Sequence, residues 1–165
     1  MFRPLRRAKQ QLDENEAKEI LARGQTGILA VLGDEGYPYT VPLNYAYEEG
    51  TIYFHCARSG HKLDAIRSCE KVSFCVIDRD DVSVEELATN YVSVVAFGEA
   101  EILEDEREIF HAAELIGKKV GGGESQVRKE IEKEWNALCC VAIRIEHMTG
   151  KEGLGLTRGR SGKAD

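Results

Sequence analysis

Residues suited to binding an anion are concentrated just after a short apolar segment near the middle of the chain. They are Arg58, Ser59, His61 and Lys62, with Gly60 among them. If Ser59 caps a helix that begins here, free amide groups and the positive end of the helix dipole point toward one spot. The sequence therefore predicts an anion site of phosphate size at this position.

A histidine precedes this cluster on a predicted strand. Because side chains alternate along a strand, Tyr53 and His55 share one face, and the other, more apolar face carries Ile52, Phe54 and Cys56. An imidazole has an ordinary pKa of about 6.5, so it can exchange a proton near neutral pH. From the residues alone, a core or interface role for His55 stays open beside a chemical one.

The segments that would position these residues are mostly strands joined by tight turns. The strands are expected at 26–32, 37–47, 51–56, 71–77, 91–103 and 139–148. Helices are expected at 13–23, 61–68, 105–116 and 126–138, and an exposed loop at 78–86. This order is typical of a mainly β fold, an antiparallel barrel or sandwich with peripheral helices.

Two of these strands contain residues that interrupt a regular ladder. In 37–47 every odd position is apolar or aromatic, but Pro42 cannot donate a ladder hydrogen bond. This strand must therefore lie at an edge, be bulged, or turn toward a ligand at Pro42. Gly98 predicts a bulge or bend in 91–103, where Ser93 is the small polar residue.

Composition indicates one soluble globular domain over residues 1–165. The chain is 42% hydrophobic and 31% charged, and no apolar run approaches the about 18 residues of a membrane helix. Its start is too weakly apolar for a secretory signal, so we expect a cytoplasmic protein. The net charge of -7 argues against nucleic-acid binding.

Five cysteines, without the spacing of a zinc site, are expected to be reduced and mostly buried thiols. Cys139 and Cys140 are adjacent on a strand and must point to opposite faces, which disfavours a shared metal or a disulfide between them. No metal site is predicted.

Both ends of the chain are basic. The basic residues are Arg3, Arg6, Arg7 and Lys9 at the start, and Lys151, Arg158, Arg160 and Lys163 at the end. Solvated termini are the simpler interpretation; the alternative is that one end folds over an anionic ligand or a partner subunit. We expect the glycine-rich tail from Gly150 to be poorly ordered in isolation.

The order of several motifs resembles a known family. These motifs are Val41-Pro42-Leu43-Asn44-Tyr45, the strand 50–55, Gly60-His61-Lys62, the strand 91–94 leading to Gly98, and the segment 143–151. Together they resemble the FMN-binding split-barrel proteins related to pyridoxamine 5'-phosphate oxidase, and among these the nitroimidazole-resistance-like branch. The resemblance spans about residues 13–151, leaving basic extensions at both ends.

The resemblance implies a six-stranded antiparallel Greek-key split barrel and a homodimer that binds FMN at its interface. It assigns the FMN phosphate to Arg58, Ser59, His61 and Lys62, and the edge of the flavin ring to the backbone of Val41, Pro42, Leu43 and Asn44. His55 would lie beside the flavin as the catalytic residue. Ser93 or Asn44 would hydrogen-bond the ring.

The implied activity is that of an FMN-dependent oxidoreductase similar to nitroimidazole reductases. NADH or NADPH would reduce the flavin, which would pass electrons to a nitro compound or another small acceptor. The alternative is a flavin- or haem-binding protein without enzymatic activity. A pyridoxamine phosphate oxidase proper is disfavoured, because the C-terminal segment lacks an arginine cluster for a substrate phosphate.

Overall fold

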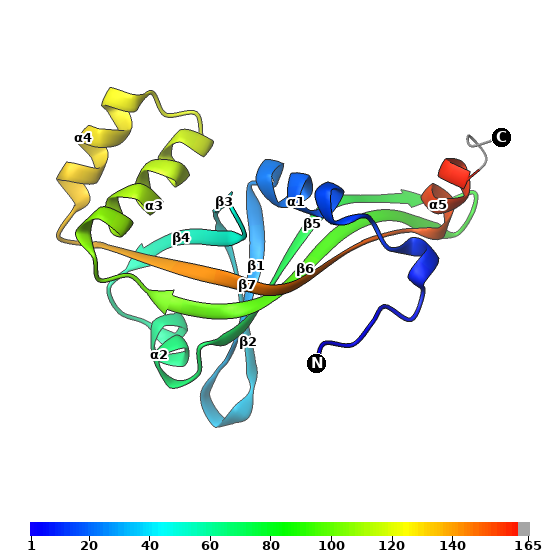
Figure 1. The fold of residues 1–165 in the computed structure, drawn as a ribbon, viewed down its shortest axis with the longest axis horizontal. Helices are drawn as coiled ribbons and strands as arrows, with labels where there is room; N and C mark the ends of the chain where they lie inside the picture. Colours follow the sequence, from blue (N-terminus) through cyan, green and yellow to red (C-terminus); the bar gives the residue numbers. More distant parts are fainter. Residues whose placement is uncertain (162–165) are drawn as a thin grey trace.

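The computed structural model describes residues 1–161, in which helices surround a single β-sheet (Figure 1). The strands are β1 (Thr26–Leu32), β2 (Pro38–Asn44), β3 (Ala46–Glu48), β4 (Thr51–Ala57), β5 (Lys71–Ser83), β6 (Ala88–Ile102) and β7 (Leu138–Glu152). The α-helices are α1 (Glu14–Arg23), α2 (His61–Ser68), α3 (Glu106–Lys119), α4 (Glu124–Glu134) and α5 (Leu154–Ser161), and short 3-10 helices are η1 (Ala8–Gln10) and η2 (Asp34–Gly36). The predicted mainly β class with peripheral helices is confirmed.

The sheet is antiparallel and seven-stranded, in the order β2-β1-β5-β6-β7-β4-β3. The expected strand 37–47 is divided into β2 and β3 because Tyr45 turns into the core, where it is 1% exposed. Its hydroxyl donates a hydrogen bond to the carbonyl of Leu21 in α1, at 2.7 Å. The sheet is therefore not closed by hydrogen bonds, and the predicted six-stranded barrel is not confirmed.

Pro42 lies on an edge strand, which is one of the three alternatives that the sequence left open. The amide of Gly33 donates to the carbonyl of Tyr37 at 2.8 Å, which makes the odd-numbered residues of β2 the hydrogen-bonded ones. The even-numbered residues, Pro42 included, turn their backbone groups to the open edge. The proline therefore costs no ladder hydrogen bond.

The sheet separates two apolar clusters. The larger cluster lies between the sheet and helices α1 and α2, and it contains Ile52 and Phe54. The smaller cluster lies where β4 and β7 meet the helical hairpin α3–α4, which projects from one end of the molecule (Figure 1). Cys139 belongs to the first cluster and Cys140 to the second, so their predicted opposite orientation is confirmed.

The bulge predicted at Gly98 is confirmed, and a side chain caps the first helix. Asp13 caps α1 by accepting a hydrogen bond from the amide of Glu16 at 2.9 Å. The register of β6 against β7 shifts between Phe97 and Gly98. A Cβ atom at Gly98 would lie 2.1 Å from the carbonyl oxygen of Arg144, so only glycine fits there.

Two expectations about element boundaries were wrong. In the segment 78–86, expected as a loop, residues 78–83 belong to β5 and pair with the start of β6, and only residues 84–86 lie in the turn of this exposed hairpin. Helix α4 ends at Glu134 instead of residue 138.

No helix within residues 1–161 is long and apolar enough to cross a membrane.

Residues 150–161, part of the tail expected to be poorly ordered in isolation, form mostly regular secondary structure. Residues 150–152 belong to β7, and α5 follows. The guanidinium of Arg160 pairs with Glu16 and with the buried Glu152, both at 2.9 Å, so charge holds this helix against the sheet. Lys163 lies outside the described residues.

Candidate functional site

The residues predicted to bind an anion lie in the turn from β4 into α2. The helix begins at His61, as expected, but Gly60 and not Ser59 is its N-cap. Gly60 has a φ of 131° and its carbonyl accepts hydrogen bonds from the amides of Leu63 and Asp64. No side chain caps the helix, so its first two amides, those of His61 and Lys62, stay available to an anion.

The cationic side chains around this turn point in different directions. Arg58 donates a hydrogen bond to the carbonyl of Trp135, 3.2 Å away, where α4 leads into β7. The ring of His61 stacks on Tyr39 at 4.2 Å between centroids and accepts a hydrogen bond from the amide of Asp34 at 3.4 Å. His61 thus anchors α2 to the β1–β2 turn.

Lys62 and Ser59 complete the group predicted to bind phosphate. Ser59 is exposed in the loop, and Lys62 is half-buried at the first turn of α2. The ammonium of Lys62 is close enough to lower the pKa of the Cys56 thiol at the end of β4, although burial of that thiol raises it more. The positive charge of Lys62 therefore acts beside the strand that carries His55.

A cavity of about 550 Å³ lies between the end of β4 and the α3–α4 hairpin. The sheet contributes Asn44, His55, Cys56 and Ala57 to its lining. The helices contribute apolar residues such as Ile116 and Val127, together with the polar residues Gln126, Glu130 and Glu134. This size and mixture are typical of small-molecule sites.

Sequence reasoning did not identify the helical wall of this cavity. Val127 and Ile131 lie on the apolar stripe of α4, and both are buried. Glu130 lies next to this stripe and lines the cavity although its side chain is exposed and pairs with Lys133. Its place there has no separate sequence signal, because it depends on how α3 and α4 pack over β4.

His55 projects into this cavity from the face of β4 opposite the main core. Ile52 and Phe54 are fully buried in that core, so the predicted division of the strand into two faces is confirmed. The imidazole remains accessible, yet partial burial lowers its pKa below 6.5. His55 is therefore mostly neutral at neutral pH.

The residues predicted to contact a ring edge, Val41 to Asn44, form the last part of β2. Val41 and Leu43 pack against the core, whereas Pro42 and Asn44 are exposed. The carbonyl of Pro42 and the amide of Asn44 turn to the open edge by the parity of the ladder. Asn44 also lines the His55 cavity, so the structure brings these two predicted residues together.

Ser93 does not lie near these residues within one chain. It faces Lys151 on β7, whereas His55 faces Cys140 on the same strand. These two positions of β7 are eleven residues apart (151 minus 140), which corresponds to about 36 Å along a strand. The contact of Ser93 with a flavin ring stays a prediction.

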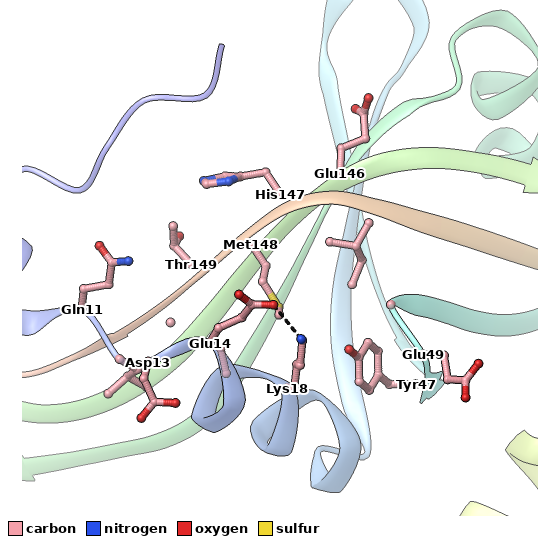
Figure 2. Close-up of a pocket in the computed structure, with 15 residues that line it drawn as sticks. Gln11, Asp13, Glu14, Lys18, Tyr47, Glu49, Glu146, His147, Met148 and Thr149 are labelled. Carbon is pink, nitrogen blue, oxygen red and sulfur yellow. Dashed lines mark ion pairs between the residues drawn. The ribbon is translucent and has the colours of Figure 1, made fainter.

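A second cavity, of about 740 Å³, lies between α1 and β7 (Figure 2). Figure 2 shows the ion pair of Lys18 with Glu14, 2.6 Å long, on the helix side, and His147 and Met148 on the strand side. No residue predicted for the anion or ring site lines this cavity, so we place the candidate site at His55. Within residues 1–161 no three His, Cys, Asp or Glu side chains are arranged to hold a metal ion.

The fold and the site define a mainly β protein with a binding cavity between an open sheet edge and a helical hairpin. The sequence profile of the pyridoxamine 5'-phosphate oxidase family matches residues 13–152. The chain therefore belongs to this family, as the motif resemblance predicted. No curated protein sequence matches the chain.

Solved structures share the fold. A Bacteroides thetaiotaomicron protein, provisionally assigned to 5-nitroimidazole antibiotic resistance, is 21% identical, with a TM-score of 0.72 over 87% of this chain and 86% of its own. An FAD-binding protein from Mesorhizobium loti is 24% identical, with a TM-score of 0.64 over 86% and 96%. An FAD and haem binding protein from Mycobacterium smegmatis is 18% identical, with a TM-score of 0.71 over 88% and 74%.

Proposed function

We propose that this protein binds FMN beside His55 and acts as a flavin-dependent oxidoreductase. The observation that carries the proposal is the cavity that joins His55 to the open edge of β2, a few residues from the uncapped start of α2. Family membership and the flavin-binding structures of the same fold support it.

The residues present fit the two ends of FMN. An uncapped helix start with Lys62 and Arg58 nearby suits a dianionic phosphate, because amides and cations both stabilise its charge. Ser59 adds a hydroxyl, and His61 contributes its backbone amide while its ring holds Tyr39. The open backbone groups of Pro42 and Asn44 suit the polar edge of a planar ring.

Bound FMN would supply the redox chemistry, with NADH or NADPH as donor and a nitro compound or another small acceptor as substrate. The protein residues would position the acceptor and handle a proton. His55 would donate a proton to the acceptor from its imidazolium form and take it back from solvent. Because burial lowers its pKa, this form is more populated below neutral pH.

We also propose that the site is completed in a homodimer. Apolar side chains remain exposed on the sheet, such as Leu32 and Ile77, which are 51% and 55% exposed. Ser93 could contact a flavin only if a second copy brings it to the site, given its separation from His55 along β7. In this proposal β2 and β3 act as one strand of a six-stranded split barrel.

A flavin- or haem-binding protein without enzymatic activity is the second candidate. It is favoured by the shared fold with the FAD and haem binding protein, and by the accessible, mostly neutral imidazole of His55. A neutral imidazole is the form that ligates haem iron. Reduction of bound flavin by NADH or NADPH, followed by reoxidation with a nitro compound, separates the enzyme from the binder.

The phosphate assignment is tested with the double variant Arg58→Ala/Lys62→Ala. Charged hydrogen bonds contribute about 1.5–3 kcal/mol each, so the loss of two should weaken FMN binding about a hundredfold or more. The matched control is Arg79→Ala/Lys118→Ala, which removes the same charge from exposed positions elsewhere. FMN titration followed by flavin fluorescence measures both, and equal affinities would refute the assignment.

A further inference from the structure

Strands β4 and β7 place two cysteines that are far apart in the sequence directly opposite each other. In the register of these strands Cys56 faces Cys139. The amide of Ile145 donates to the carbonyl of Gly50, opposite it, at 3.0 Å. Hydrogen-bonded and non-hydrogen-bonded pairs alternate along an antiparallel ladder, and Cys56 is an even number of residues from Gly50, so the two cysteines are a hydrogen-bonded pair. Such pairs have Cα atoms about 5.5 Å apart, which is close to the usual separation in disulfides.

The two thiols also share one face of the sheet. Cys139 belongs to the main apolar cluster and Cys56 packs against it, whereas Cys140 lies in the cluster on the opposite face. Cys139 is near enough to Cys56 to contribute to the raised pKa of its thiol. A bond between their sulfur atoms therefore needs side-chain rotation and no change of strand register.

Each of the two cysteines lines a different cavity. Cys56 lines the His55 cavity, and Cys139 lines a cavity of about 560 Å³ that also contains Arg58 and Arg67. In the proposal below, these two cavities are the routes by which a small disulfide compound approaches the pair. Burial raises the pKa of the Cys56 thiol to about 11, so exchange through this thiol is expected to be slow at neutral pH.

We propose that Cys56 and Cys139 form a reversible cross-strand disulfide by exchange with a low-molecular-weight disulfide such as oxidised glutathione. One cysteine thiolate attacks the disulfide and releases one glutathione thiolate, which takes up a proton. The second cysteine, losing its proton, attacks the mixed disulfide and expels the second glutathione. Two protein thiols are oxidised and one glutathione disulfide is reduced to two thiols.

This bond would act on the candidate site through the backbone. Cys56 is adjacent to His55, and β4 leads from it directly to Arg58 and α2. Arg58 is already tied to the carbonyl of Trp135 shortly before Cys139. Oxidation would therefore fix the end of β4 to the start of β7. Formation of this disulfide does not depend on whether the protein binds flavin.

The test uses the full-length protein equilibrated with mixtures of reduced and oxidised glutathione, then alkylated and analysed by intact mass and non-reducing peptide mapping. The expected product is lighter by two hydrogen atoms before alkylation, and it retains three of the five cysteines as thiols (five minus two). Its single linked peptide pair contains Cys56 and Cys139, and dithiothreitol restores five thiols.

Variants identify the pair independently. Cys56→Ala and Cys139→Ala should each abolish the disulfide, while Cys140→Ala, a buried neighbour on the other face, should still form it. Oxidised wild-type protein should also unfold at a higher urea concentration than the reduced protein. Five free thiols at every glutathione ratio, or a linkage that involves other cysteines, would overturn the proposal, and peptide mapping of the wild type decides this even if a variant fails to fold.

Discussion

Replacing Lys119 with methionine is expected to stabilise the protein. The ammonium of Lys119 is buried and has no hydrogen-bond partner among residues 1–161; it lies 4.0 Å from the centre of the Tyr45 ring. Burial of an unpaired polar group costs about 1–3 kcal/mol and more for a charge, and a desolvated cation–π contact returns about 2 kcal/mol. Methionine keeps the apolar stem, so we expect a net gain of about 1 kcal/mol in the free energy of unfolding.

The pH dependence of this gain follows from the lowered pKa of Lys119. Burial lowers the pKa in the folded protein below 10.5, the value in the unfolded chain. Between these two pKa values the unfolded state binds more protons, so the stability of the wild type rises with pH there. The advantage of Lys119→Met should therefore be largest at neutral pH and shrink toward pH 10.5.

Urea denaturation at neutral and alkaline pH measures both effects. The control is Lys118→Met, because Lys118 is exposed and pairs with Glu114 one turn away at 3.2 Å. This control should lose about 0.3–0.5 kcal/mol, with no comparable change on the alkaline side. If Lys119→Met destabilises the protein as much as the control does at neutral pH, the interpretation of an unpaired buried ammonium is refuted.

Three further substitutions test other parts of the structure. Gly98→Ala should destabilise the protein by about 3 kcal/mol or more, because its Cβ would lie 2.1 Å from the Arg144 carbonyl oxygen. The control is Gly123→Ala, whose Cβ has open space around it; a smaller drop in melting temperature for Gly98→Ala than for this control would contradict the prediction. Asp13→Ala removes the cap of α1 and should cost about 1 kcal/mol in urea denaturation. If His55 donates a proton, turnover should fall as pH rises through a pKa below 6.5, and His55→Ala should remove this dependence while keeping flavin bound; an unchanged profile would exclude the role.

The parts of the fold that depend on local sequence were predictable. The cap of α1 and the bulge at Gly98 follow from single residues whose backbone demands are strong. The two faces of β4 follow from alternation. By contrast, the part of β5 that extends the hairpin has charged, exposed residues at consecutive positions from Asp78 to Asp81, so it lacks the alternation that would reveal a half-buried strand.

The candidate site was predictable only where its residues are contiguous. The turn from β4 into α2 was located correctly, but Gly60 replaces Ser59 as the cap because a φ of 131° suits glycine and not serine. The directions of Arg58 and His61 depend on Trp135 and Tyr39, which belong to distant segments. Such partners are set by tertiary packing, which one sequence does not display.

The interruption at Tyr45 explains why a cavity exists beside His55. The β3–β4 ladder pairs Ala46 with Tyr53 and ends there. If the ladder continued by two residues in the same register, Asn44 would face His55. Tyr45 turns into the core instead, and Asn44 pairs with Thr26 in the ladder between β2 and β1. Asn44 and His55 are thus left on either side of a gap in the hydrogen bonding, and both line the cavity. The same residue that prevents closure of the sheet therefore leaves backbone groups free for a ligand.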